Sequence, residues 1–395
     1  MRFFISDLAS KRLLLSMFLL FLAGMLFGID KEDIKVTAPT FKSNSGINVT
    51  ELNNAAADAF NDLQNTLYEK LNFLPDNFNK LAGGFANASV FSSDGASQRG
   101  YEGYNAFCFT FGFMGAIQLP QFYILKNIIN TINNSEGEIG PDVLKDIVNT
   151  PFGLDAQISA QFGINTSKFL LKGLYLGFMF SKLDTNWIKA IPVSGFSFKT
   201  MSVGVNVNYQ LIKQMRLLGS LLVWRGLNLG TGFIWQNTIL NITPALSIDD
   251  VPIRIHGFDD ISMPVNGDIR LGFGTNTYII PVEAMTSIRI AWFLNLAFGA
   301  GVDVAFGSSR VVASGSFNVD EDKVNKDLQN NGLVMETAPS LVLSPQGGKS
   351  GPSIFNTKLM FAAGFNFGPI IIDIPVTYYL LSNGWSLGLT FGVTL

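Results

Sequence analysis

The last eleven residues of the chain are the segment that most constrains its fold. They alternate without interruption between apolar side chains and small, uncharged ones. Because successive side chains of a strand point to opposite faces, this segment predicts a strand with one apolar face. An unpaired apolar edge strand promotes aggregation, whereas a lipid-facing strand that pairs with the first strand of a barrel does not. The apolar residues are Trp385, Leu387, Leu389, Phe391, Val393 and Leu395.

The same period of two recurs along most of the chain from Phe107 onward. In the first such segment, four phenylalanines share one face, which on a helix would scatter around the axis. Asn383-Gly384 and Asn266-Gly267 are typical of tight hairpin turns. The segments expected to form strands are 104–118, 153–165, 168–181, 195–212, 215–230, 231–247, 266–280, 282–291, 293–307, 310–319, 352–367, 369–382 and 384–395.

These thirteen segments predict an all-β fold with minor α content, a transmembrane antiparallel β-barrel. Bacterial barrels of a single chain almost always have an even number of strands, so we expect 12–14, with 14 favoured. The chain is 48% hydrophobic and only 14% charged, against ~25% in an average soluble domain. Its hydrophobicity is spread over short segments, as barrel strands require.

Three regions divide the chain. Residues 1–28 have the layout of a secretory signal peptide, with basic residues before the apolar run Leu13–Phe27. Residues 29–103 are expected to form a helical and irregular segment, either a plug inside the barrel or a periplasmic segment. Within it, three- and four-residue spacing predicts a helix over 51–74, and 76–103 is expected to be irregular. Residues 104–395 are the barrel, with a helical insertion at 120–150.

Charge and cysteine content exclude several classes of function. The formal net charge is −3, which provides no basic patch for nucleic acid. The only cysteine, Cys108, permits neither an intrachain disulfide nor a thiolate metal cluster, and it is expected on the lumen face. The only histidine, His256, lies in an acidic segment and is interpreted as a solvated loop residue. We therefore expect no enzyme, no catalytic residue, no metal site and no cofactor.

The inward faces of the strands carry the remaining functional information. They are rich in Gly, Ala, Ser, Thr, Asn and Gln, and a barrel of 12–14 strands is too wide for such side chains to fill. Either water or another part of the chain must occupy the interior. Charged side chains are expected there as well, either as ion pairs and plug contacts or as a path for solute. These lumen-facing candidates are Arg270, Arg289, Asp303, Lys358 and Asp373.

The signal peptide, the alternating segments and the C-terminal strand together resemble bacterial outer-membrane β-barrel proteins. Counted back from Leu395, the alternate residues Val393, Phe391 and Leu389 look like their C-terminal assembly signal, although the usual last residue is aromatic. The resemblance implies location in the outer membrane, contact with the lipid bilayer and recognition by the barrel-assembly machinery. An N-terminal segment before about 14 strands is similar in plan to the FadL-type fatty acid transporters, whose Asn-Pro-Ala hatch motif is not found here.

Three functions remain open at this point, of which a barrel enzyme that uses His256 is the least favoured. The first is a channel or transporter for small or hydrophobic solutes. The second is a structural or surface-interaction barrel, similar to an adhesin, whose acidic segments 248–265 and 319–351 meet partners.

Overall fold

The fold was analysed in a computed structural model of the whole chain. The residues that it describes are 34–43, 49–71, 78–93, 106–119, 152–168, 171–185, 196–243, 245–253, 261–319 and 333–395. The expected signal peptide at 1–28, the helical insertion at 120–150 and His256 lie outside these residues. So do 254–260 and 320–332, which contain much of the two acidic segments.

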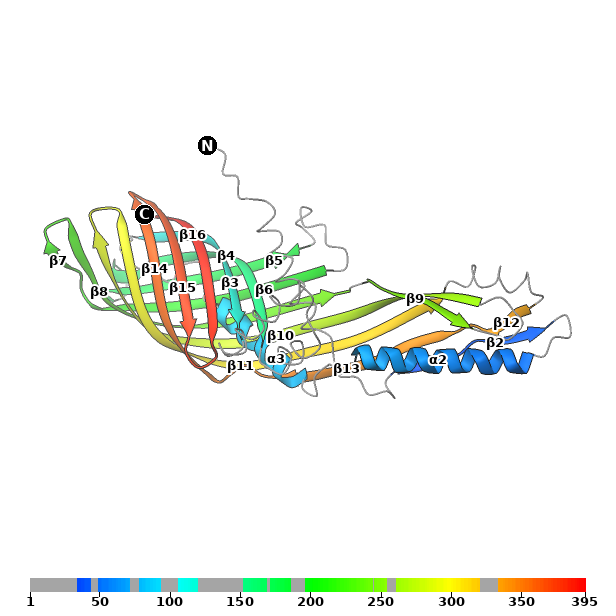
Figure 1. The fold of residues 1–395 in the computed structure, drawn as a ribbon. Helices are drawn as coiled ribbons and strands as arrows, with labels where there is room; N and C mark the ends of the chain where they lie inside the picture. Colours follow the sequence, from blue (N-terminus) through cyan, green and yellow to red (C-terminus); the bar gives the residue numbers. More distant parts are fainter. Residues whose placement is uncertain are drawn as a thin grey trace, which may run out of the picture.

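Ten antiparallel strands close into a barrel within the described part of the chain (Figure 1). The fold class expected from the sequence is thereby confirmed. Each strand is hydrogen-bonded to two neighbours in the ring, and β10 and β11 pair to complete it. In ring order the strands are β3 (Phe107–Gln118), β4 (Gly153–Asn165), β5 (Leu174–Asp184), β6 (Phe196–Ile212), β8 (Leu222–Ile242), β10 (Ile261–Ile290), β11 (Leu294–Val319), β14 (Phe355–Phe367), β15 (Ile370–Tyr379) and β16 (Gly384–Thr394).

The expected number of 12–14 strands is too high, because three expected pairs of strands are single strands. Segments 215–230 and 231–247 contribute to β8, 266–280 and 282–291 form β10, and 293–307 and 310–319 form β11. The expected breaks fall at Gly230-Thr231, at Pro281 and at Gly307-Ser308-Ser309, yet the ladder continues through all three. Asn266-Gly267, expected to form a turn, is paired with Asn318 and Phe317 inside this ladder.

The C-terminal strand closes the barrel against the first strand, as predicted. β16 pairs with β3 over its whole length, with Leu389 opposite Phe113 and Phe391 opposite Phe111. Asn383 has a φ of 49° in the turn that connects β15 to β16, which agrees with the predicted hairpin. This pairing leaves no unpaired strand edge between β3 and β16. In lipid, every backbone polar group must find a hydrogen-bond partner within the protein.

The two faces of the barrel wall differ in polarity. On β3 and β16 the large apolar side chains are exposed, whereas Cys108, Thr110, Ser386 and Thr390 are buried on the inner side. The outer row continues on the other strands with residues such as Phe178, Phe233, Phe298 and Phe361. A closed barrel with an apolar outer belt is the architecture of outer-membrane proteins, and the expected location in the outer membrane follows from it.

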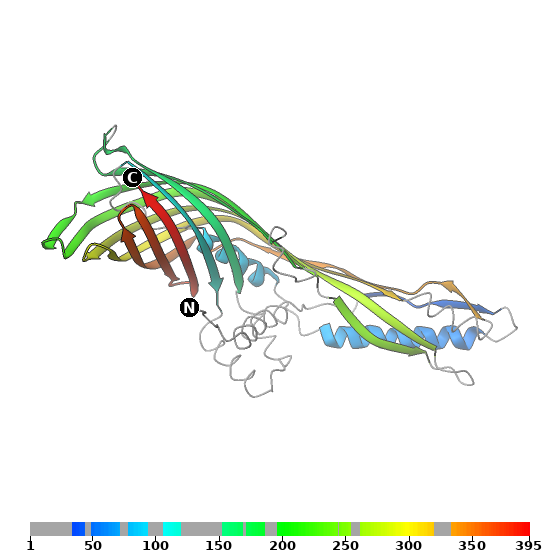
Figure 2. The ribbon, with the colours of Figure 1, turned by 90° about the horizontal axis from the view of Figure 1, so that it is seen from above.

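An arm extends from one end of the barrel (Figure 2). Strands β10 and β11 have 30 and 26 residues, far more than the ~9–11 that cross a bilayer, and their extensions form the centre of the arm. The other arm elements are β1 (Ile34–Thr37), β2 (Thr40–Ser43), α2 (Val49–Leu71), β9 (Ala245–Ile253), β12 (Leu333–Thr337) and β13 (Ser340–Ser350).

Two helices follow one another in the N-terminal region. The helix predicted over 51–74 is confirmed as α2, which buries Leu52, Ala56 and Phe60 against β1 and β2 of the arm. The expectation of irregular structure over 76–103 is wrong, because Phe78–Ser92 form helix α3. No helix in the described ranges is long and apolar enough to cross a membrane.

The two rims of the barrel carry different connections. At one rim, β10 is joined to β11 and β14 to β15 by two or three residues, and the C-terminus lies there as well. We call this the short-turn rim, and the opposite one, from which the arm extends, the arm rim. Short strand β7 (Met215–Leu218) pairs with β8 at the short-turn rim.

A charged residue in the middle of β16 tests the lipid contact. We expect Leu389→Arg to lower the free energy of unfolding by about 2–4 kcal/mol, the cost of a base at the bilayer midplane. The matched control is Leu171→Arg, an exposed leucine at the short-turn rim, for which a loss of about 0–1 kcal/mol is expected. Urea unfolding in lipid vesicles measures both, and equal losses would contradict the placement of β16 in the bilayer.

Candidate functional site in the barrel lumen

Helix α3 occupies the lumen at the arm end of the barrel. Twelve of its fifteen residues are buried, and only Asn79, Lys80 and Gly83 near its first turn are not. It contacts strands on opposite sides of the ring, including β3, β4, β8, β10, β11 and β16. A helix that is apolar or small on every side is stable only when it is enclosed, and the barrel provides that enclosure.

Polar side chains of the wall hold the C-terminal end of α3. The Gln157 side-chain amide donates to the Ser92 carbonyl oxygen, and Gln236 Nε2 donates to Ser92 Oγ over 2.8 Å. Ser89 Oγ and Thr277 Oγ1 are 3.1 Å apart and share a hydrogen bond. These contacts satisfy polar groups of the last helical turn that lie away from bulk water, where an unpaired group costs about 1–3 kcal/mol.

A buried carboxylate supports this arrangement from the second strand of the ring. Asp155 Oδ2 accepts hydrogen bonds from Gln236 Nε2 at 2.7 Å and from Thr238 Oγ1 at 3.0 Å. Its Oδ1 accepts from the backbone N–H of Ala156 at 2.7 Å. Since Gln236 also bonds Ser92, Asp155 fixes the orientation of the amide that holds the helix.

Aromatic contacts fix the other side of α3. The Phe91 and Tyr379 rings stack with centroids 3.9 Å apart, and the Phe85 and Phe273 rings lie 4.3 Å apart. Phe91, Tyr379 and Val90 belong to an apolar cluster formed by inward residues of six different strands. The helix is therefore packed against the wall as tightly as a core element, not suspended in an open channel.

Two glycines allow α3 to touch the wall backbone. A Cβ on Gly84 would overlap the backbone of Phe152, and a Cβ on Gly153 would overlap the backbone of Gly84. Only glycine permits such an approach of helix to strand. Gly83, one position earlier, has more room, because the nearest atom to its Cβ would be Ser350 Oγ at 3.3 Å.

Two of the five lumen candidates, Lys358 and Asp303, form an ion cluster on the wall together with Glu283, which the sequence analysis did not single out. Lys358 Nζ lies 2.8 Å from Asp303 Oδ1 and 2.6 Å from Glu283 Oε1. Lys358 and Asp303 are fully buried, and Glu283 is partly buried. Lys358 lies opposite Tyr379 in the β14–β15 ladder, so the cluster is adjacent to the ring that stacks on α3.

The three remaining lumen candidates lie outside the ion cluster. Asp373 is buried on β15, and Arg289 is half-buried on β10 near the short-turn rim. The expectation for Arg270 is wrong, because this residue is exposed beyond the end of β8, at the start of the arm. Arg270 and Arg289 belong to one continuous strand, and an odd separation places them on opposite faces. The sequence interpretation had assigned them to two different strands.

Cys108 is buried in the lumen beside Tyr175 and Ile371. Within the described ranges, no three His, Cys, Asp or Glu side chains gather as metal ligands would.

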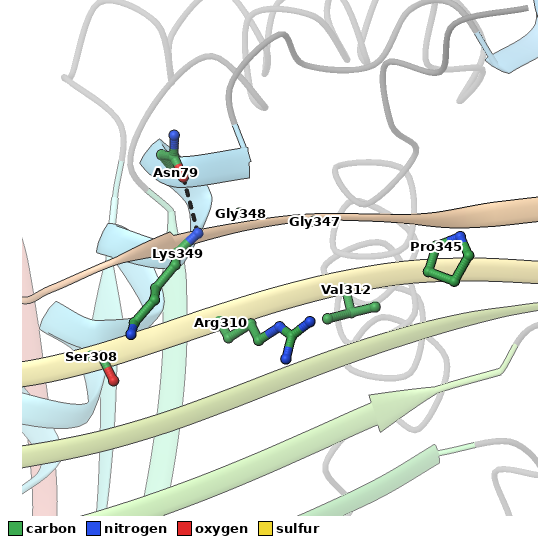
Figure 3. A pocket seen from close by; sticks show the side chains of 8 residues that line it. All are labelled: Asn79, Ser308, Arg310, Val312, Pro345, Gly347, Gly348 and Lys349. Atoms are coloured by element: carbon green, nitrogen blue, oxygen red, sulfur yellow. Dashed lines mark hydrogen bonds between the residues drawn. The ribbon is translucent and has the colours of Figure 1, made fainter. Parts of the chain in front are cut away.

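A pocket of about 520 Å³ opens at the arm rim, where α3 enters the barrel (Figure 3). Arg310 on β11 and Lys349 on β13 lie directly opposite each other in the ladder. The backbone N–H of Lys349 donates to Asn79 Oδ1 over 2.9 Å, which ties the first turn of α3 to β13. The pocket is lined by Asn79, Ser308, Arg310, Val312, Pro345, Gly347, Gly348 and Lys349.

The sequence did not single out the residues that hold α3. Asp155, Gln157, Gln236 and Ser92 are ordinary inward or helical positions in the alternation, with no spacing that marks a site. One usable signal was present: an inward carboxylate and a glutamine on the same strand, Asp155 and Gln157, require hydrogen-bond partners inside the lumen. The partner that they hold could be found only from the fold.

The closed ring, the apolar belt and the polar interior define this chain as an outer-membrane β-barrel protein. It belongs to the Lsa36-like family, whose model matches residues 33–394. No curated protein matches the sequence.

Several solved structures are similar in fold at low sequence identity. The transport unit of the autotransporter AIDA-I from Escherichia coli is 9% identical, with a TM-score of 0.29 and coverage of 80% of this chain and 98% of that one. The translocator domain of the autotransporter NalP from Neisseria meningitidis is 9% identical, with a TM-score of 0.27 and coverage of 86% and 97%. A Pseudomonas aeruginosa FadL homologue is 10% identical, with a TM-score of 0.22 and coverage of 80% and 96%.

The contact between Gly84 and Gly153 provides a test of how α3 is held. We expect Gly84→Ala to lower the free energy of unfolding by about 1–3 kcal/mol, because the added methyl group overlaps backbone atoms that cannot rotate away. Gly83→Ala is the matched control, because Ser350 can move and alanine favours the helix, so a change within about 1 kcal/mol is expected. Urea unfolding in detergent micelles measures both variants. Equal effects would contradict the close packing of α3 on β4.

Proposed function

We propose that this protein is a surface-interaction barrel, in which the membrane-embedded ring anchors the arm and presents it to partners outside the cell. The observation that carries this proposal is the burial of α3 on every side within the lumen. A ten-stranded ring is narrower than the expected one of 12–14 strands, and α3 fills its arm end with a packed core. A barrel built to conduct solute would leave this space to water.

The arm has the properties of a folded body that can present a surface. Ile34, Phe41, Leu52 and Phe60 are buried in one apolar cluster, which continues through Phe78 and Leu81 of α3 into the barrel. The N-terminal segment is therefore joined to the barrel by a continuous core and by the long strands β10 and β11. A rigid connection of this kind positions the arm at a fixed direction from the membrane.

The connections at the two rims support an orientation with the arm outside. Outer-membrane barrels have short periplasmic turns and longer extracellular loops. The two- and three-residue turns after β10 and β14 lie at the short-turn rim, and the arm lies at the other. In the same orientation β16 ends on the periplasmic side, where its apolar row, from Trp385 to Leu395, would meet the barrel-assembly machinery.

A transport function is the second candidate, favoured by the polar lumen wall. Gln157, Gln236, Thr277 and Asp373 are inward side chains of the kind that line aqueous pores. A small solute could pass only if α3 left its position. In that case residues 29–103 would act as a plug, and the ion cluster at Lys358 would contribute to selectivity.

Conductance in a planar bilayer separates the display function from that of a channel that is open in the intact protein. We expect the intact protein to be silent and a variant that lacks residues 29–100 to conduct, because removal of α3 opens the lumen. Heat-modifiable gel mobility confirms that each form is a folded barrel. Conductance of the intact protein equal to that of the deletion variant would contradict the display function and favour a channel.

Labelling of single cysteines on intact cells tests the orientation. In a Cys108→Ala background, Asp58→Cys places a thiol on the exposed face of α2, and Arg216→Cys places one on β7 at the short-turn rim. We expect a membrane-impermeant maleimide to label Asp58→Cys on intact cells and Arg216→Cys only after permeabilisation. The reverse result would place the arm in the periplasm and overturn the proposal.

A further inference from the structure

The pocket at the arm rim contains two bases in an unfavourable arrangement. Arg310 and Lys349 lie directly opposite each other on antiparallel strands, and both side chains are exposed. Like charges at directly opposite positions destabilise a sheet. Within the described ranges, no carboxylate forms an ion pair with either side chain. An anion between them would remove this repulsion.

The pocket lies just beyond the lipid-facing belt, on the same face of the wall. On β11 the outward residues are Phe298, Val302 and Phe306, and the same parity continues to Ser308 and Arg310. Phe306 stacks on Tyr278 at 5.5 Å, and Phe233 follows at 6.2 Å, so a row of aromatic rings marks the edge of the belt. Such rows flank the apolar band of outer-membrane barrels, where the hydrocarbon core of the membrane meets the lipid headgroups.

The distance along the strand matches a headgroup position. Arg310 is four residues beyond Phe306, which is about 13 Å of strand at ~3.3 Å per residue. Both bases therefore lie near the polar layer of the membrane. The Lys349 ammonium extends toward Ser308 and the belt, whereas the Arg310 guanidinium extends the other way along the strand, toward Val312 (Figure 3). Gly347 carries no side chain that would block the approach of a ligand to this face.

We propose that Arg310, Lys349 and Ser308 form a binding site for the phosphate group of a membrane lipid headgroup. The lipid's acyl chains would lie along the apolar belt below, against Phe306. The bases would supply charge-assisted hydrogen bonds to the phosphate oxygens, and the hydroxyl would donate a further one. Basic pockets on membrane proteins bind anionic headgroups in this way. This proposal requires only that the barrel is embedded in the membrane. It does not depend on whether the arm binds a partner.

Native mass spectrometry of the full chain in detergent tests this site with matched lipids. The probes are phosphatidic acid and diacylglycerol with the same acyl chains, which differ only in the phosphate group. We expect the wild-type protein to retain phosphatidic acid at least about tenfold better, because charge-assisted hydrogen bonds of this kind are individually strong. Equal retention of the two lipids would overturn the proposal.

Two double variants identify the residues and control for net charge. Arg310→Gln with Lys349→Gln should abolish the preference for phosphatidic acid. Lys213→Gln with Arg216→Gln removes two exposed bases at the short-turn rim and should leave the preference unchanged. An unchanged preference in the first variant would overturn the site. Heat-modifiable mobility of both variants shows whether each is folded, and the single variant Arg310→Gln replaces the double one if the latter does not fold.

A third probe distinguishes a lipid from a free anion. Inorganic phosphate in large excess over phosphatidic acid should displace little of the lipid, because it lacks the contacts of the acyl chains with the belt. Displacement at equal concentration would mean that the pocket binds free phosphate, and the assignment to a lipid headgroup would then be wrong.

Discussion

Closure of the backbone hydrogen-bond ladder is the constraint on which the rest of this structure depends. In lipid, an unpaired strand edge leaves a row of polar groups without partners, each at a cost of several kcal/mol. Pairing of β16 with β3 removes the last open edge of the ring. Once the ring is closed, every strand has one face toward lipid and one toward the lumen. The apolar row and the small residues opposite it therefore both follow from closure.

Closure also creates a lumen with empty space and polar groups that need partners, and α3 fills the arm end of this lumen. Small inward side chains leave space in the lumen, and the wall polar groups need partners there. Helix α3 supplies backbone and serine oxygens to Gln157 and Gln236, aromatic surface to Tyr379 and Phe273, and a glycine at its contact with Gly153. The wall and the helix are thus complementary in polarity and in shape. Such complementarity favours a permanent occupant of the lumen, in agreement with the proposed display function.

The sequence correctly predicted those elements that have a single clear periodicity. The alternation of β3 and β16, their pairing and helix α2 were predictable because each has a clear period of two or 3.6 and an apolar face. Three strands were divided in error, because glycine, proline and polar residues at the expected breaks resemble turns although the ladder crosses them. The extension of β10 and β11 into an arm depends on pairing with β9 and β13, which lie largely within the acidic segments 248–265 and 319–351 and were not expected to form strands.

The lumen site was less predictable, for a related reason. Helix α3 has no polar face, so the amphipathic pattern that reveals α2 is missing in it, and its stability comes from the wall that surrounds it. Which inward charges meet depends on the register of strands distant in sequence: Lys358 reaches Asp303 and Glu283 because β14 and β10 are both neighbours of β11. Arg270 was assigned to the wrong face for a different reason. The sequence pattern divided β10 into two strands, and this wrong boundary reversed the face on which Arg270 was placed. In a barrel, therefore, the face of a residue follows from local alternation, whereas its partners follow only from closure and register.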